Sequence, residues 1–138
     1  MKLRRLTKTL IRHEGMRGKP YDCPAGFLTI GVGRNLEANG ISEEEALVLL
    51  RNDIVSCYQQ CKREFSWFED LNDVRQEAII NLVFNIGLDG FKKFKKTIGF
   101  IKQEKWSEAA TELLDSRYAD QVGKRAQEVS RMLETGVL

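Results

Sequence analysis

Glycine and proline are concentrated in one short stretch of the sequence, residues 17–35. Both prolines of the chain lie there, and together with three glycines they separate short apolar pieces: Pro20, Pro24, Gly26, Gly31 and Gly33. Such punctuation is typical of a compact hairpin or a small sheet. Because no other part of the sequence favours strands, the chain is predicted to be mostly helical with one small sheet.

One helix is predicted before this stretch and one after it. Apolar residues recur at helical spacing near the start of the chain and Gly15 offers a C-terminal stop, which predicts a helix over residues 2–14. Ser42 and Glu45 have the spacing of a capping box and precede an apolar run. They predict a long helix over residues 42–62.

A strongly apolar helix is predicted to begin at Asn72 or Asp73 and to end at Gly87. Its apolar residues are spread around most of the circumference, which is typical of a central, buried helix: Val74, Ala78, Ile79, Leu82, Val83 and Ile86. Shorter helices are predicted to follow at about residues 97–103, 107–114 and 124–134.

These elements predict an α+β, mostly helical architecture in a single domain, residues 1–138. A small N-terminal lobe (about residues 12–41) contains the hairpin. A larger all-helical lobe (about residues 62–138) is completed by the N-terminal helix. The helix over residues 42–62 joins the two lobes, and a cleft between them is the expected ligand site.

Composition narrows the choice of partners. The chain has 22 Lys and Arg against 20 Asp and Glu, and this formal charge of +2 is too small to demand a nucleic-acid partner. A basic cluster is formed by Lys92, Lys93, Lys95 and Lys96. We interpret it first as a solvated surface. Attraction to an anionic cell wall is the second interpretation, and nucleic-acid binding is the third.

The three cysteines, Cys23, Cys57 and Cys61, cannot close into a full set of disulfides and are interpreted as thiols in a reducing compartment. A zinc site would need a fourth ligand, and His13 is the only histidine, so neither a metal nor another cofactor is expected. Charges interrupt the N-terminal segment where a signal peptide needs an apolar core, and no apolar run is long enough to cross a membrane. The protein is therefore expected in the cytoplasm until it is released.

Three blocks of motifs follow one another along the chain. The first runs from Arg12-His13-Glu14-Gly15-Met16-Arg17 through Tyr21 to Gly26-Phe27-Leu28-Thr29-Ile30-Gly31-Val32-Gly33. The second comprises Leu71, Val74-Arg75, Ala78-Ile79, Asn81, Val83-Phe84-Asn85 and Gly87. The third comprises Lys105-Trp106, Glu108-Ala109-Ala110, Ser116-Arg117 and Arg125-Ala126. In this order they closely resemble the phage-type lysozymes, also called endolysins (glycoside hydrolase family 24), over nearly the whole chain.

The resemblance implies a lysozyme-like fold and a catalytic group made of Glu14, Cys23 and Thr29. Glu14 is the implied general acid, and Thr29 the residue that holds the attacking water. The middle position of the family carries Asp or Cys, and here it is Cys23, whose ordinary thiol is only slightly ionised at pH 7. Asp22 is the neighbouring carboxylate and an alternative partner of Glu14. Arg17 and Lys19 are cations whose charge would favour the Cys23 thiolate.

Four further residues are implied as substrate contacts, namely Phe84, Asn85, Thr97 and Glu112. Arg125 is implied to hold Glu14. Gly31 and Gly33 are interpreted as positions where the backbone passes close to the sugar or turns sharply. Arg34 takes the place of a common His, and Asp53 is its expected ion-pair partner.

The implied activity is hydrolysis of the β-1,4 bond between N-acetylmuramic acid and N-acetylglucosamine in bacterial peptidoglycan, with inversion, leading to lysis of the host cell. A monomer is expected, together with a separate pore-forming protein for release, and no insertion into the membrane. A catalytically silent cell-wall-binding relative and, more remotely, a nucleic-acid-binding helical domain are the alternative interpretations.

Overall fold

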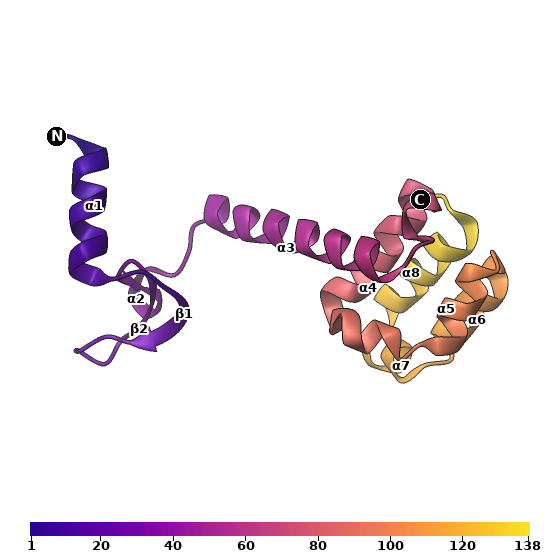
Figure 1. Ribbon diagram of the computed structural model, residues 1–138. Coiled ribbons are helices and arrows are strands. Elements are labelled where there is room, and N and C mark those ends of the chain that lie inside the picture. Colours follow the sequence, from indigo (N-terminus) through magenta and orange to yellow (C-terminus); the bar gives the residue numbers. More distant parts are fainter. The chain divides into compact units, whose positions relative to one another are not determined.

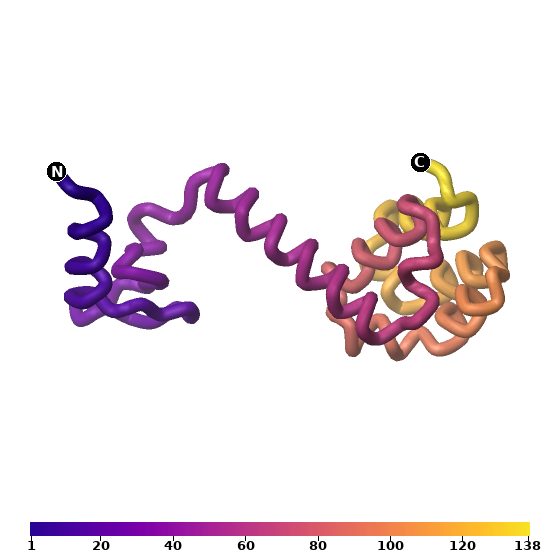
Figure 2. Tube along the Cα trace, turned by 45° about the horizontal axis from the view of Figure 1, so that its top comes forward, coloured from indigo at the N-terminus to yellow at the C-terminus, as the bar shows by residue number.

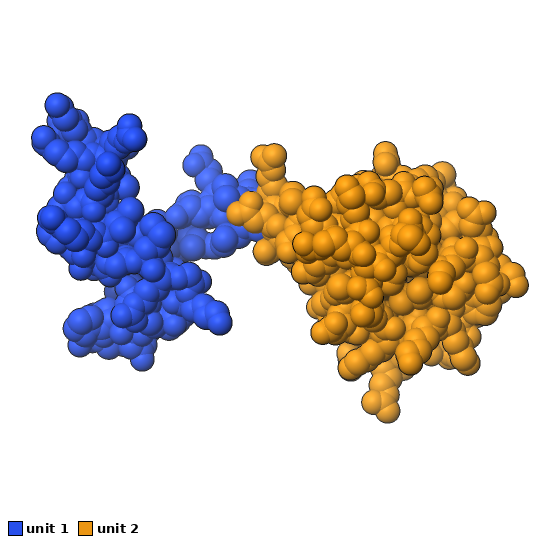
Figure 3. Space-filling model, in the orientation of Figure 1, with its two compact units in different colours: residues 1–49 blue, residues 50–138 orange.

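Helices make up most of the chain, and all its strands lie in one small antiparallel sheet (Figure 1). The computed structural model describes residues 1–138 and divides them into two units, residues 1–49 and residues 50–138 (Figure 3). The prediction of a mostly helical α+β fold is thus confirmed. The expected grouping into two lobes of one domain stays a prediction.

The sheet belongs to the first unit and has the order β1-β2-β3, with β1 at Arg17–Asp22, β2 at Leu28–Gly31 and β3 at Arg34–Asn35. Both pairs of strands are antiparallel. Tyr21 lies opposite Thr29, and Asp22 lies opposite Leu28. The register is irregular between Arg17 and Tyr21, where Pro20 cannot donate a ladder hydrogen bond.

The helices beside the sheet begin and end close to the predicted positions. Helix α1 spans Leu3–Glu14, and the backbone N–H of Gly15 donates to the Ile11 carbonyl at its end. The short helix α2 (Leu36–Asn39), which the sequence did not predict, follows β3 directly. Helix α3 spans Glu43–Glu64, and the division between the two units falls within it.

The second unit is built around α4 (Asp73–Lys92), which Asn72 caps by accepting from the Arg75 N–H. Gly87 interrupts the helical backbone with φ +79°, as its predicted role as a stop requires, but a further helical turn follows it. The remaining helices are α5 (Lys95–Lys102), α6 (Trp106–Leu114), the unpredicted α7 (Arg117–Val122) and α8 (Lys124–Thr135). A 3-10 turn, η1 (Phe68–Asp70), precedes α4.

The core of this unit confirms the central position of α4. Its residues Ala78, Ile79, Leu82 and Val83 are buried in one apolar cluster with residues from every other helix of the unit. Helix α6 packs against α5 and α8, and α8 packs against α4, an arrangement that can be followed along the trace in Figure 2. No helix of the structure combines the length and apolar character that a membrane span requires.

Candidate functional site

Glu14 is the last residue of α1 and is exposed. Its carboxylate lies against Gly33, in the turn between β2 and β3: a β-carbon built on Gly33 would lie 2.9 Å from Glu14 Oε2. Gly33 has φ +70°, a conformation that glycine adopts without strain. The turn therefore brings bare backbone to the predicted acid.

A hollow of about 460 Å³ lies over the same turn. Its lining comes from the turn itself and from residues just after it: Ile30, Gly31, Val32, Gly33, Arg34, Asn39, Ile41 and Glu45. Since Gly33 both lines this hollow and contacts Glu14, there is open space close to the predicted acid in the first unit.

Cys23 opens the tight turn between β1 and β2. Its carbonyl accepts from the Gly26 N–H (2.8 Å), and its own N–H donates to the Phe27 carbonyl (3.0 Å). Pro24 stands at the second position of this turn, which its fixed φ favours, and Gly26 adopts φ +85°. The residues from Cys23 to Phe27 thus fold back on themselves into a tight turn closed by these two hydrogen bonds.

Hydrogen bonding within this turn lowers the pKa of the Cys23 thiol below its ordinary value. The backbone of Phe27 has the largest effect, partial burial opposes it, and the backbone of Ala25, the Thr29 side chain and the Gly26 backbone lower the pKa further. Hydrogen-bond donors that face a sulfur favour its charged form. The Cys23 thiol is therefore more easily ionised to the thiolate than the thiol of an ordinary cysteine.

Thr29 lies in β2 beside this thiol and is only 2% exposed. Its hydroxyl donates to the Phe27 carbonyl at 2.7 Å. A threonine has one hydroxyl proton and two lone pairs. The Thr29 oxygen can therefore accept a hydrogen bond from a neighbour while it donates to Phe27, or the hydroxyl can rotate to donate to the Cys23 sulfur.

Asp22 occupies the opposite face of the sheet. Successive side chains of a strand point to opposite faces, and Asp22 pairs with Leu28 while Tyr21 pairs with Thr29. Cys23, two residues after Tyr21, is on the Thr29 side. Asp22 is exposed, as is Leu28, so the alternative partner of Glu14 points away from the Cys23–Thr29 contact.

Arg17 and Lys19 do not account for the lowered pKa of Cys23. The Arg17 guanidinium lies over the ring of Tyr21, 4.3 Å from its centroid, in a cation–π contact. The causes of the lowered pKa all lie in the turn and in Thr29. The expectation that these two cations favour the thiolate is therefore corrected in favour of the hydrogen bonds of the turn.

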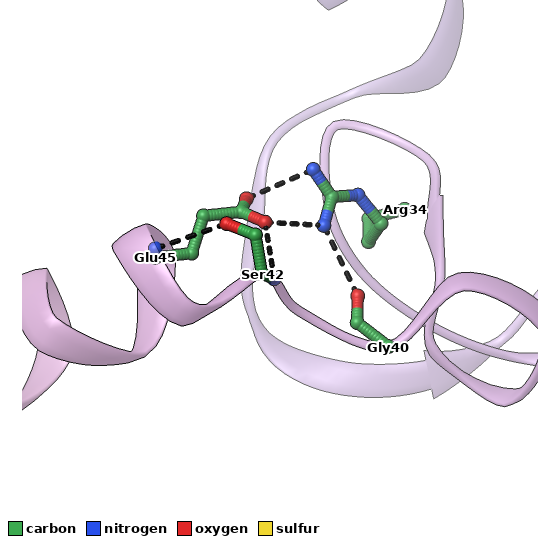
Figure 4. A network of polar contacts seen from close by, with 4 residues as sticks. All are labelled: Arg34, Gly40, Ser42 and Glu45. Carbon is green, nitrogen blue, oxygen red and sulfur yellow. Dashed lines mark hydrogen bonds and ion pairs between the residues drawn. The ribbon is translucent and has the colours of Figure 1, made fainter.

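Arg34 is bound by Glu45 and not, as expected, by Asp53. Its Nη1 and Nη2 lie 3.0 and 2.9 Å from Glu45 Oε1 and Oε2, and Nη1 also donates to the Gly40 carbonyl (Figure 4). Glu45 completes the predicted capping box, since its Oε1 accepts from the Ser42 N–H while its own N–H donates to Ser42 Oγ. These bonds tie β3 to the start of α3.

This pairing changes the acidity of both partners. Hydrogen bonds from Arg34 and then from Ser42 lower the pKa of Glu45 to about 2, and the hydrogen bonds that Arg34 donates to Glu45 raise the pKa of Arg34. The carboxylate is therefore charged over the whole neutral and mildly acidic range.

The remaining predicted residues lie in the second unit. Phe84 and Asn85 are exposed on α4, and Glu112 is partly buried on α6, whereas Thr97 is only 2% exposed and does not present its hydroxyl to solvent. Phe84 and Arg125 line one hollow of about 460 Å³, together with Leu50, Ile54, Glu77, Ile80 and Asn81.

Arg125 is held by Asn81, a contact that the sequence did not predict. Its Nε donates to Asn81 Oδ1 (2.9 Å), and its Nη2 lies 3.4 Å from the Asn81 carbonyl. Asn81 is a polar residue inside a strongly apolar helix, and that position is the signal that could have singled it out. No group of three or more His, Cys, Asp or Glu side chains is arranged to hold a metal ion.

Comparison with known proteins gives a consistent answer. Residues 11–132 match the family described as phage lysozyme. Similar curated proteins include probable T4-type lysozyme 2 of Dictyostelium discoideum, 39% identical over 71 residues, which are 51% of this chain and 42% of that protein. The endolysin of Acyrthosiphon pisum secondary endosymbiont phage 1 is 36% identical over 58% of this chain and 56% of its own length. The endolysin of Salmonella phage P22 is 31% identical over 59% of this chain and 60% of its own length. The matched regions thus span about half the length of these relatives.

Proposed function

The chain belongs to the phage lysozyme family, and we propose that it is a muramidase of bacterial peptidoglycan. It hydrolyses the β-1,4 bond between N-acetylmuramic acid and N-acetylglucosamine with inversion at the sugar carbon, and so lyses the host cell. Its partner in release is a separate pore-forming protein, and it works as a monomer.

The fit of Glu14 against Gly33, beside the hollow over the turn and in the same unit as Cys23 and Thr29, is the observation that carries this proposal. Glycoside hydrolysis with inversion needs one group to protonate the leaving oxygen and another to activate water. Glu14 is an exposed carboxyl next to open space, and the Cys23–Thr29 pair offers a polarised thiol and a hydroxyl. These two chemistries are the ones that the reaction requires.

In the proposed reaction Glu14 protonates the glycosidic oxygen as the bond breaks. Thr29 accepts a hydrogen bond from the attacking water and fixes its direction. The Cys23 thiolate takes up the proton of that water, which the donors of the turn make possible by stabilising the charged sulfur. Asp22 takes no part, because its side chain lies on the other face of the strand.

The second unit is proposed to supply substrate contacts. Phe84 is exposed and large enough for a sugar face to pack on it, and Asn85 beside it offers an amide for hydroxyl groups. Glu112 and Thr97 are kept as proposed contacts on the strength of the family resemblance. Arg125, whose guanidinium is held by Asn81, keeps the supporting role that the family resemblance implies.

Digestion of purified peptidoglycan tests the proposal. The wild-type chain should release fragments that end in reducing N-acetylmuramic acid, detected by mass spectrometry after borohydride reduction. Glu14→Gln keeps the shape but removes the transferable proton, so hydrolysis should fall at least about a hundredfold while wall binding survives. Glu43→Gln, at an exposed carboxyl in the first turn of α3, is the matched control and should retain activity.

Wall binding by the wild type without any new reducing ends would contradict a muramidase and support the silent relative. New ends on N-acetylglucosamine instead of N-acetylmuramic acid would contradict the proposed bond. A fully active Glu14→Gln variant would leave the activity standing but remove Glu14 from it.

A further inference from the structure

A second hollow, of about 340 Å³, lies in the helical unit far along the chain from Glu14, Cys23 and Thr29. Six residues line it, namely Phe65, Lys92, Lys95, Ile98, Gly99 and Lys102. Four of them come from α5 at relative positions 0, 3, 4 and 7, which lie on one face of a helix. That face therefore has a lysine at each end and an apolar middle. The two lysines are separated by about 10 Å of helix rise.

The charge of this region is strongly unbalanced. Residues 91–105 contain six lysines and a single acidic residue, Glu104, in a chain whose overall excess is only two positive charges. Lys92 is neutralised locally by Glu64, whose Oε1 lies 2.9 Å from its Nζ. Lys95 and Lys102 take part in none of the ion pairs of the structure. The hollow is thus flanked by two cations that have no protein counter-charge.

Gly99 contributes bare backbone to the lining of the hollow. It lies inside α5, where glycine weakens a helix relative to alanine. Its backbone does not adopt a positive φ, and a β-carbon built on it would meet nothing within 4 Å. Neither backbone strain nor packing against the protein therefore requires glycine here. The missing side chain instead leaves space between Lys95 and Lys102.

We propose that this hollow binds an anionic polymer in which phosphate groups alternate with short uncharged carbon segments, that is, a poly(polyol phosphate) chain. Two phosphates pair with Lys95 and Lys102, and the carbon segment between them lies over Ile98 and Gly99. This binding is independent of glycan hydrolysis, because it uses no residue of the proposed catalytic group.

The shape and composition of the hollow favour such a chain over other anionic partners. A bilayer presents a broad surface, which contacts protruding side chains more readily than a recess floored by glycine. Single-stranded nucleic acid needs exposed aromatic rings for its bases to stack on. The only aromatic residue of the hollow, Phe65, is 7% exposed and already stacks with Trp67. A flexible chain with charges at intervals matches the remaining features, two separated cations and an apolar recess.

Two double variants with equal loss of charge test the role of the lysines. Calorimetric titration with a soluble poly(glycerol phosphate) at low salt should show binding to the wild-type chain. Lys95→Gln with Lys102→Gln should weaken that binding about tenfold. Lys93→Gln with Lys96→Gln removes the same charge from exposed lysines that do not line the hollow, and should weaken it much less. Equal losses in the two double variants, or no binding by the wild type, would overturn the proposal.

Gly99→Ala separates binding from folding, because the two measurements should move in opposite directions. The new methyl group meets no protein atom and favours the helix, so the midpoint of thermal unfolding should rise by a few degrees. It also occupies space in the recess between Lys95 and Lys102, where the carbon segment is proposed to lie, so polymer binding should weaken at least about threefold. Unchanged binding by Gly99→Ala would exclude the hollow as the site. If the protein instead bound anionic phospholipid vesicles through these lysines and did not bind the polymer, the ligand of the hollow would be a membrane surface and the proposal would be overturned.

Discussion

The carboxylate of Glu14, at the end of α1, lies against the α-carbon of Gly33, in the turn between β2 and β3. A β-carbon at position 33 would come within 2.9 Å of Oε2 and 3.0 Å of Cδ of Glu14. The helix end and the turn thus fit each other only because position 33 has no side chain. Any residue other than glycine must move either the carboxylate or the turn.

Gly33→Ala should therefore impair both activity and stability. The positive φ strains an alanine by about 1–2 kcal/mol, and the methyl group displaces the Glu14 carboxylate. A displacement of about 1 Å at a catalytic group is enough to lower the rate by up to about a hundredfold. We expect the rate of peptidoglycan hydrolysis to fall at least about tenfold. Urea unfolding of the same variant measures the loss of stability.

Gly31→Ala is the matched control for this prediction. Gly31 has a nearly identical φ, +68°, but a β-carbon there would meet nothing within 4 Å. The Gly31→Ala variant should lose about as much stability as Gly33→Ala but keep most of its activity. If both variants lose activity equally, strain in the turn is responsible and the contact with Glu14 is not.

The Arg34–Glu45 pair should make stability depend on acidity in the range below neutral. The pKa of Glu45 is lowered from 4.5 to about 2, so its contribution is fully present above pH 4.5 and is lost as the pH falls towards 2. Glu45→Gln should lower the urea midpoint at pH 7, and this difference from wild type should shrink towards pH 2. A difference that stays constant from pH 7 to pH 2 would show that Glu45 acts through shape alone. Glu43→Gln, at an exposed carboxyl two residues earlier, should not reproduce the pattern.

Elements with local signals were predictable from the sequence. The capping box of Ser42 and Glu45 fixed the start of α3, and Gly15 fixed the end of α1, because each signal acts within one turn of helix. Helix α7 was missed, since its six residues carry too short a pattern to stand out. Gly87 was recognised as a stop, but the turn of helix beyond it depends on tertiary packing around the buried Phe91.

Contacts between distant residues were less predictable. Family resemblance pointed to Cys23 and Thr29, but the N–H groups that lower the pKa of the thiol arise from the turn geometry, which spacing does not reveal. The prediction that Asp53 pairs with Arg34 was wrong, because the capping box already brings Glu45 to the loop that carries Gly40, where it pairs with Arg34. The fit of Glu14 against Gly33 joins residues 19 positions apart and has no sequence signal beyond the glycine itself.

The anomeric outcome is a separate prediction. With water as the attacking group, proton magnetic resonance of a fresh digest should show the inverted anomer before mutarotation mixes the two forms. Retention would require a covalent glycosyl intermediate. First appearance of the retained anomer would therefore make Cys23 or Asp22 a nucleophile and would exclude the proposed activation of water.

The three thiols should differ in reactivity, and this difference allows Cys23 to be modified selectively. Hydrogen bonds in the turn lower the pKa of Cys23, whereas burial raises the pKa of Cys57 and raises that of the buried Cys61 to about 12. Because the thiolate is the reacting form, iodoacetamide at pH 7 should label Cys23 first. Loss of hydrolytic activity should follow that labelling in step, as read by peptide mass spectrometry.

Substitutions at Cys23 and Asp22 decide which side chain works opposite Glu14. Cys23→Asp should keep or raise the rate, because a carboxylate is fully charged at neutral pH. Cys23→Ala should lose most of it, since Thr29 alone orients the water but accepts no proton at this pH. Asp22→Asn should have little effect, because Asp22 pairs with Leu28 on the opposite face of the sheet. A fully active Cys23→Ala with an inactive Asp22→Asn would mean that the strand shifts its register when substrate binds, and Asp22 would then be the partner of Glu14.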